Sequence, residues 1–303
     1  MDLISIISVN YNQPEVTVQF LKSIKNNANY DNVEVIIVDN GSREDHKQKF
    51  TEEYPGLIYI RSEENLGFAG GNNLGIKYAK GEFFLFLNND TEISGNLLFE
   101  LSTELKRNDN IGMISPLILY YEQPDIIQYA GFTKMNYITC RNKGIGSMEK
   151  NTGQYDNVSH PTYYFHGAAM MCRKSDLDTV GTMEENYFLY YEEYDWCEKF
   201  KRAGKIAWFT GKTKIYHKES MSVGKVSKIK TYFMTRNRML FIRRNTSFIN
   251  NALFTLYYIL FAAPKQVFKY ITGGRKDLIV WIYKGIAWNF KNGSTSSNLG
   301  IDF

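Results

Sequence analysis

Cysteine is scarce in this chain of 303 residues. The three cysteines, Cys140, Cys172 and Cys197, are odd in number and show no metal-ligand spacing. They suit a reducing cytoplasm better than a disulfide framework. The first residues, 1–4, lack a basic segment followed by an apolar core, so we expect no secretory signal and a cytoplasmic location.

Glycine is absent from residues 10–14, the turn that follows the first predicted strand at 3–9. An acidic residue, Asp39, ends the second predicted strand, which is also typical of dinucleotide-binding folds. That fold needs a glycine-rich first turn so that a pyrophosphate can approach a helix N-terminus. Residues 10–14 contain no glycine, so a nicotinamide-dependent dehydrogenase is disfavoured.

Long apolar runs are also lacking in the C-terminal region, although it is strongly basic. Residues 218–303 hold 14 Lys and Arg against 3 Asp and Glu, while residues 1–217 hold 22 against 29. The apolar segments 248–263 and 278–290 are shorter than the roughly 20 residues that span a bilayer. With lysines among aromatic residues, 248–291 is predicted to contact an anionic membrane surface peripherally. The alternative is a helical extension packed on its own domain or on a homodimer partner.

What the chain does contain is a regular alternation of strand and helix patterns. Strands are expected at 3–9, 33–38, 57–60 and 83–88, with helices at 14–25 and 70–78 between them. Later strands are expected at 163–172, 206–209 and 214–217, with a helix over 192–203. This order predicts an α/β fold with a mostly parallel, Rossmann-like central sheet and helices on both faces. With 44% hydrophobic residues, we expect one domain over 1–220 and a helical C-terminal region over 221–303.

The apolar segment 83–87 stops abruptly on Asn88, Asn89 and Asp90. A strand this apolar is expected to be buried on both faces, and its carboxyl end is where open α/β sheets bind ligands. An Asp flanked by amides can hold Mg²⁺ or Mn²⁺ through hard oxygen ligands. The alternative is an ordinary turn with Asn and Asp chemistry.

Further polar groups are expected at the same sheet edge. Tyr11 can stack on a nucleobase, and Asp39 can accept a hydrogen bond from an imide N–H. The glycine and amide segment 65–73 enters a helix, where free backbone N–H groups can meet phosphate. Glu192, Glu193 and Asp195 begin another helix. Its dipole favours acidic residues there, but their aromatic surroundings also suit a general base of raised proton affinity.

These motifs together resemble a family 2 inverting glycosyltransferase of GT-A fold, similar to rhamnosyltransferase-like enzymes of bacterial surface polysaccharide synthesis. The resemblance covers roughly residues 3–220. It rests on an ordered set of segments: 9–12, 39–42, 65–73, 87–90, 165–168, 192–195 and 215–217.

The resemblance implies roles for individual residues. Asp90 and His217 would hold the divalent metal, Mn²⁺ or Mg²⁺, and Glu193 aligns with the usual catalytic base. Glu192 and Asp195 stay open as alternatives for the base. The expected donor-binding residues are Val9, Asn10, Tyr11, Asn12, Asp39, Gly67, Gly71, Asn72, Asn88, Asn89, Asp90 and Gly167.

Two positions depart from the family pattern. Asn88 stands at the first acidic position of Asp-x-Asp, and Glu193 stands where the family usually has Asp. The expected function is transfer of a sugar, such as rhamnose, from a UDP- or dTDP-linked donor to a glycan or lipid-linked acceptor. It is expected at the cytoplasmic face of the cell membrane. A catalytically inactive module that binds nucleotide sugar or glycan is the alternative, and the apolar density of the basic region argues against a nucleic acid partner.

Overall fold

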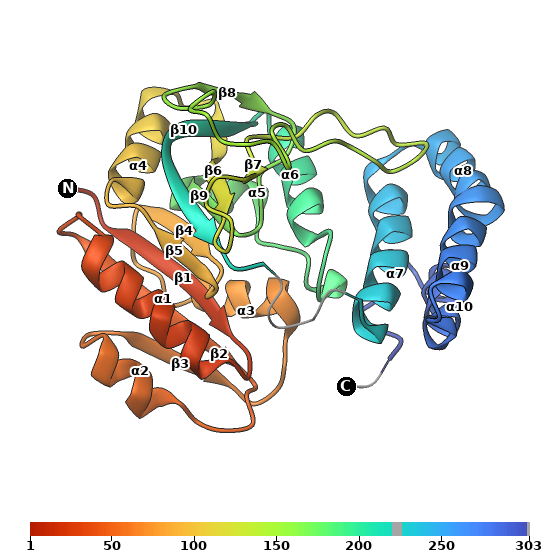
Figure 1. Cartoon of the computed structure of the whole chain (residues 1–303), viewed down its shortest axis with the longest axis horizontal. Helices are drawn as coiled ribbons and strands as arrows, with labels where there is room; N and C mark the ends of the chain where they lie inside the picture. The colour runs from red at the N-terminus through yellow and green to blue at the C-terminus, as the bar shows by residue number, and fades with distance from the viewer. Residues whose placement is uncertain (220–225, 302–303) are drawn as a thin grey trace.

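The centre of the molecule is a mixed ten-stranded sheet (Figure 1), seen in a computed structural model that describes residues 1–219 and 226–301. The strand order is β3-β2-β1-β4-β9-β6-β10-β5, with β7 beside β6 and β8 beside β10. The strands are β1 (Ile4–Asn10), β2 (Val33–Asn40), β3 (Ile58–Ser62), β4 (Phe83–Leu87), β5 (Thr91–Ile93), β6 (Ile111–Tyr120), β7 (Ile127–Tyr129), β8 (Ser159–Thr162), β9 (Ala169–Arg173) and β10 (Ile206–His217).

The long strands of the sheet run in one direction. β1 is parallel to β2 and β4, β2 to β3, and β6 to β10. β9 is antiparallel to both of its neighbours, β4 and β6, so β6 runs the same way as β4. The remaining short strands β5, β7 and β8 are antiparallel to their partners. The predicted α/β sheet is therefore found, with four antiparallel strands added.

Helices cover both faces of the sheet. One buried cluster combines side chains of α1 (Pro14–Asn27), α2 (Lys47–Glu53) and α4 (Leu97–Arg107) with Ile4 and Ile6 of β1. The other combines α3 (Gly67–Ile76), α5 (Lys174–Val180) and α6 (Glu192–Arg202) with Ile7. Alternate residues of β1 thus enter opposite cores, as the twofold period of a strand requires. β4 is buried along its whole length, as predicted.

Some predicted bounds differ from the observed ones. The two strands expected at 206–209 and 214–217 are one strand, β10, with an irregularity between Thr210 and Lys214 that interrupts its pattern. Of the strand expected at 163–172, only β9 is regular, because residues 163–168 form a loop. Helix α3 begins three residues before the expected start, at Gly67.

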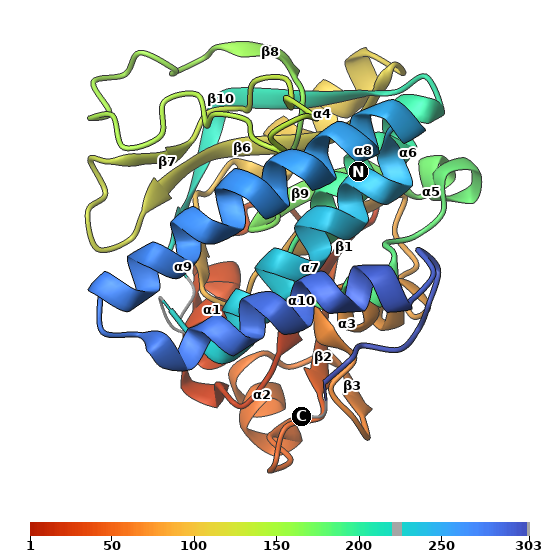
Figure 2. The same ribbon diagram turned by 90° about the vertical axis from the view of Figure 1, so that its right-hand side faces the viewer.

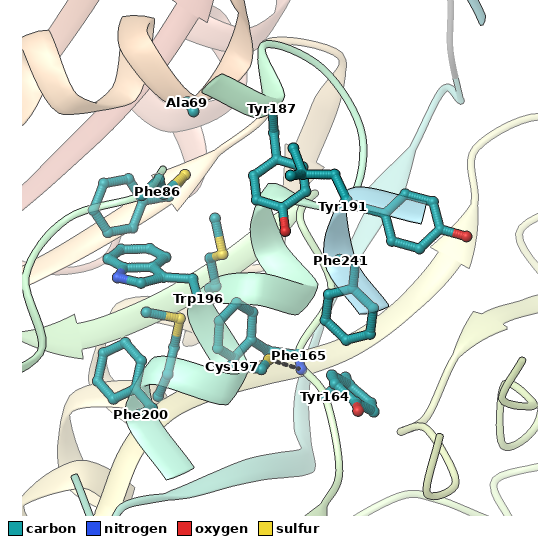
Figure 3. Close-up of a cluster of buried hydrophobic side chains, with 14 of the residues drawn as sticks. Ala69, Phe86, Tyr164, Phe165, Tyr187, Tyr191, Trp196, Cys197, Phe200 and Phe241 are labelled. Carbon is teal, nitrogen blue, oxygen red and sulfur yellow. Dashed lines mark hydrogen bonds between the residues drawn. The ribbon is translucent and has the colours of Figure 1, made fainter. Parts of the chain in front are cut away.

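The C-terminal helices lie together beside α6, and the first of them packs directly against α6 (Figures 1 and 2). They are α7 (Lys228–Asn245), α8 (Phe248–Tyr257), a π-helical turn η2 (Tyr258–Ala262), α9 (Ala263–Thr272) and α10 (Ile279–Lys291), with short 3₁₀ turns η1 (Glu185–Tyr187) and η3 (Lys276–Leu278). Phe241 of α7 joins Tyr164, Tyr191 and Trp196 in one buried cluster (Figure 3). The predicted domain boundary at 220/221 lies outside the described residues. Within the described ranges, no helix has both the length and the apolarity needed to cross a membrane.

Candidate active site

A cavity of about 580 Å³ lies at the carboxyl ends of β1, β4 and β10. It gathers residues from distant parts of the chain, as predicted for this sheet edge. The predicted site residues that line it are Val9, Tyr11, Gly67, Asn72, Asn88, Asn89, Asp90, Gly167, Glu192, Glu193 and His217. The predicted residues that do not line it are Asn10, Asn12, Asp39, Gly71 and Asp195.

Asp90 and His217 face each other on one side of this cavity. Asp90 Oδ1 lies 3.2 Å from His217 Nε2, and neither buried atom has a hydrogen-bond partner among the described residues. Gln128 Oε1 lies 2.8 Å from His217 Nδ1. Because an amide oxygen only accepts hydrogen bonds, Nδ1 carries the hydrogen and Nε2 presents its lone pair to Asp90.

Two buried acceptors in contact require a cation or a proton between them. A carboxylate oxygen and an imidazole nitrogen are ordinary ligands of Mn²⁺. Adjacent octahedral ligands about 2.1 Å from such an ion are separated by about 3 Å, close to the observed spacing. The pair therefore fits a divalent metal. Over residues 1–219 and 226–301, no cluster of three His, Cys, Asp or Glu side chains accompanies it, so further ligands would come from elsewhere.

Asp39 is not part of the cavity lining. Its carboxylate is fully buried and accepts hydrogen bonds from Tyr59 Oη at 2.8 Å and Asn10 Nδ2 at 3.2 Å. Arg61 lies 3.8 Å from the same group. Tyr11, by contrast, is 40% exposed and lines the cavity. The ring that could stack on a base is open, while the predicted imide acceptor is already hydrogen-bonded.

The glycine segment brings α3 close to the cavity. Gly67 has φ +71°, a left-handed conformation that glycine adopts without strain, and a Cβ there would overlap the Phe188 carbonyl. Asn40 Nδ2 donates to Gly67 O at 2.9 Å and so fixes this turn. A Cβ at Gly71 would lie 3.0 Å from both Val9 methyl groups, so Gly71 serves helix packing and not the cavity surface.

Glu192 and Glu193 enter the cavity from the first turn of α6. Tyr190 and Tyr191 precede them with φ values of 71° and 75°, so the chain turns through a left-handed segment just before the helix. Burial raises the pKa of Glu193 to about 7. Burial, together with the adjacent Glu193 carboxylate, holds the pKa of Glu192 well above its ordinary value. A carboxylate of pKa near 7 is suited to accept a proton at neutral pH.

Asp195 points away from the cavity into the junction with α7. Its Oδ1 accepts hydrogen bonds from Asn245 Nδ2 at 2.6 Å, Tyr187 Oη at 3.0 Å and Arg244 Nε at 3.2 Å. These partners give the buried carboxylate a structural role. Of the three predicted candidates for the base, Glu192 and Glu193 are the two that reach the cavity.

The cavity also holds residues that were not predicted as site residues. They include Gln128, Phe132, His166 and Tyr194. His166 stacks on Phe132, and its Nδ1 accepts from the Ala168 N–H at 3.1 Å. Burial lowers its pKa to about 3, so the imidazole is neutral. His166 lies within the motif segment 165–168, so the sequence could have indicated it, whereas no sequence pattern marked Gln128.

Two curated relatives show what this chain is similar to. The low-salt glycan biosynthesis hexosyltransferase Agl10 of Haloferax volcanii is 31% identical over 67% of this chain, and the match spans 62% of that protein. The dTDP-rhamnosyl transferase RfbF of Shigella flexneri is 27% identical over 71% of this chain and 72% of its own length.

Solved structures share the fold at low identity. GalNAc-T7 with UDP, GalNAc and Mn²⁺ matches 80% of this chain and 48% of its own, with 16% identity and a TM-score of 0.63. The mannosyltransferase PcManGT of Pyrobaculum calidifontis, with GDP-Man and Mn²⁺, matches 96% of this chain and 87% of its own, with 12% identity and a TM-score of 0.58. The predicted GT-A fold is thus confirmed. Residues 5–181 match the family model described as "Glycosyl transferase family 2", and the chain belongs to that family.

Proposed function

We propose that this protein is an inverting glycosyltransferase that moves a sugar from a nucleotide-diphospho-sugar to an acceptor hydroxyl group. The observation that carries the proposal is that the Asp90–His217 pair and the Glu192–Glu193 pair line one cavity. One pair suits a metal and the diphosphate, and the other suits proton removal. Sugar transfer needs both functions at one place.

Glu193 is the proposed general base. With a pKa of about 7, it can take the proton of the acceptor hydroxyl as that oxygen attacks the anomeric carbon. The nucleoside diphosphate departs from the opposite face, so the sugar configuration inverts. Burial and the adjacent Glu193 carboxylate also raise the pKa of Glu192, so the two neighbours would share a single negative charge during proton removal.

Asp90 and His217 are the proposed ligands of Mn²⁺ or Mg²⁺. When bound, the metal would act as a Lewis acid for the departing diphosphate. Asn88 and Asn89 lie beside Asp90 in the cavity lining and carry no charge. Because the protein supplies one carboxylate and one imidazole, the donor's own phosphates would complete the coordination. We therefore expect weak metal affinity without donor.

The donor is proposed to be a UDP- or dTDP-linked sugar, and the acceptor a glycan or lipid-linked sugar of a bacterial surface polysaccharide. Support for the nucleobase of the donor comes from the UDP in GalNAc-T7 and from the name of the Shigella dTDP-rhamnosyl transferase. The names of the Haloferax hexosyltransferase Agl10 and of the Shigella rhamnosyl transferase support a hexosyl or rhamnosyl group as the sugar transferred. Val9, Tyr11 and Asn72 line the side of the cavity proposed for the nucleotide.

The C-terminal helices are proposed to place the enzyme on the cytoplasmic face of the cell membrane. Large apolar side chains of α8, η2 and α9 are exposed, among them Phe248 at 84%, Phe261 at 65% and Phe268 at 67%. Lys265 and Lys269 lie on the same helical run, so the surface combines apolar and cationic groups. This combination suits anionic lipid headgroups over an apolar interior.

A panel of nucleotide sugars tests the proposed activity. Purified protein is incubated with UDP- and dTDP-linked sugars, lipid-linked acceptors and Mn²⁺, with a chelator in parallel. We expect metal-dependent transfer from at least one donor, with a product of opposite anomeric configuration by NMR. Binding of a nucleotide sugar without turnover would support the inactive binding module instead. A retained configuration would contradict the single displacement.

A further inference from the structure

The loop from Asn186 to Tyr191 has a backbone that its own sequence does not favour. Phe188, Tyr190 and Tyr191 have φ values of 64°, 71° and 75°. A left-handed conformation costs an ordinary L-residue about 1 kcal/mol or more. Three such residues within four positions need external contacts to hold them. The loop matters because Glu192 and Glu193 follow it directly.

Asn237 of α7 supplies those contacts. Its Nδ2 lies 2.8 Å from three carbonyl oxygens of the loop, those of Tyr187, Leu189 and Tyr190. The Asn237 side chain is fully buried. Its two amide hydrogens are therefore shared among three carbonyl groups that water does not reach from that side.

Arg236 fixes the orientation of the Asn237 amide. Its Nη1 donates to Asn237 Oδ1 at 2.6 Å, and its Nη2 donates to Asn186 O at 2.7 Å. The Arg236 guanidinium is fully buried and lies 3.9 Å from the Trp288 ring centroid of α10. The Asn237 oxygen is thus engaged by a cation, which leaves its nitrogen facing the loop.

We propose that Asn237 is a positioning residue that sets the direction in which Glu192 and Glu193 enter the cavity. The expected effect on catalysis rests on the proposed function. Removing the amide would leave the Leu189 and Tyr190 carbonyl groups without that donor, while Tyr187 O would keep the Leu189 N–H at 2.7 Å. The left-handed residues would then relax toward ordinary φ values. A shift of about 1 Å in a catalytic group can lower a rate about 100-fold. The C-terminal helices would then be part of the catalytic unit.

In the described structure Asn237 reaches the nucleotide side of the cavity only through the loop, which meets α3 where the Phe68 N–H donates to Phe188 O at 2.7 Å. Val9, Asn40 and Asn72 belong to β1, β2 and α3, which Asn237 does not contact through any hydrogen bond of the described structure. A positioning defect should therefore lower kcat and leave nucleotide binding unchanged. A general loss of structure would weaken both.

Asn237→Ala is the test, and Asn289→Ala is its matched control. Asn289 is also a buried amide at the interface of α7 with α10, where Nδ2 donates to the Arg236 and Gly285 carbonyls at 2.9 and 3.0 Å. In the part of the chain that the structure describes, its side chain makes no hydrogen bond to residues 186–191. We expect Asn237→Ala to lower kcat about 10- to 100-fold, with Kd for UDP or dTDP in Mn²⁺ within twofold of wild type. Asn289→Ala should lower Tm comparably but keep kcat within twofold.

Amide hydrogen exchange of residues 186–193 tests the effect of Asn237 on the loop independently of the proposed activity. We expect faster exchange there in Asn237→Ala and unchanged exchange in Asn289→Ala, whether or not a sugar donor has been found. If Asn237→Ala does not fold, Asn237→Ser keeps one hydroxyl donor and should show a smaller loss of the same kind. Wild-type exchange and kcat in a folded Asn237 variant would overturn the inference, as would an equal kcat loss in both alanine variants.

Discussion

Glu193 links the chemistry of the cavity to the stability of the fold. Its side chain is partly buried, and this desolvation raises the pKa of its carboxyl group to about 7; the pKa of Glu192 beside it is raised as well. The native state therefore binds these protons more tightly than the unfolded chain does. Stability from this group is complete below the unfolded pKa near 4.5 and is lost as the pH rises toward 7.

Glu193→Gln should thus raise stability at alkaline pH while it removes the proposed base. At pH 8 we expect an increase of roughly 1 to 2 kcal/mol in the free energy of unfolding, seen as a higher Tm, because no charge remains to be buried. At pH 4.5 the two proteins should melt alike. The exposed Glu63, changed to Gln, should alter Tm at neither pH. A Tm increase of the same size at both pH values would contradict the pKa shift.

At the scale of single residues, the sequence located much of the cavity but not every contact. Asp90, His217, Glu192 and Glu193 line it because strand ends and a helix start, both readable from local patterns, converge there. Asp195 carried the same local signal, yet its partners Arg244 and Asn245 come from α7, about 50 positions later in the chain. No local pattern reports such a partner, and the same holds for Gln128 beside His217.

At the scale of elements, the first third of the chain was predictable and the later part less so. β1, α1, β2 and β4 have strong apolar patterns, and the three strands are neighbours in the sheet, with β1 between β2 and β4. β9 lies between β4 and β6 although many residues separate it from both. Its antiparallel direction depends on where the long connection after β7 returns, which no short segment encodes.

The contact of α3 with the Asn186–Tyr191 loop makes a testable element-level prediction. Gly67→Ala would force a left-handed residue with a Cβ against the Phe188 carbonyl, so we expect a loss of about 2 to 4 kcal/mol in unfolding free energy. Gly204→Ala is the control, because Gly204, which follows α6, has a similar φ of +77° and open space around it. It should lose only about 1 kcal/mol. Equal denaturant midpoints for the two variants would show that α3 and the loop do not press together.

At the scale of the whole molecule, the charge division of the sequence corresponds to a spatial division. The basic C-terminal helices lie together on one side of the sheet, and α7 and α10 join the same core as α6 (Figures 1 and 2). The sequence indicated a helical region there, but not that α7 contacts the loop before Glu192 and Glu193. The separate domain over 221–303 stays a prediction.

Vesicle binding tests the proposed membrane surface. Wild-type protein should sediment with phosphatidylcholine vesicles that contain phosphatidylglycerol, and less with phosphatidylcholine alone. Changing Phe248 and Phe261 together to Asn should weaken binding at least about tenfold, because each ring would lose its apolar burial. Phe99→Asn is the control, since Phe99 is 50% exposed but lies on α4. If the double variant changes the oligomeric state and not vesicle binding, the surface contacts a second copy of the chain.

The central claim, that Glu193 is the general base, is tested most directly by the rate of sugar transfer. The rate is measured for wild type, Glu193→Gln and Glu192→Gln at saturating donor and Mn²⁺. We predict that Glu193→Gln binds the donor normally but transfers about 100- to 10,000-fold more slowly, as expected for a lost general base. Glu192→Gln should keep a larger share of the activity. Near-normal transfer by Glu193→Gln, with the loss in Glu192→Gln or in a folded Asp195→Asn, would contradict the account.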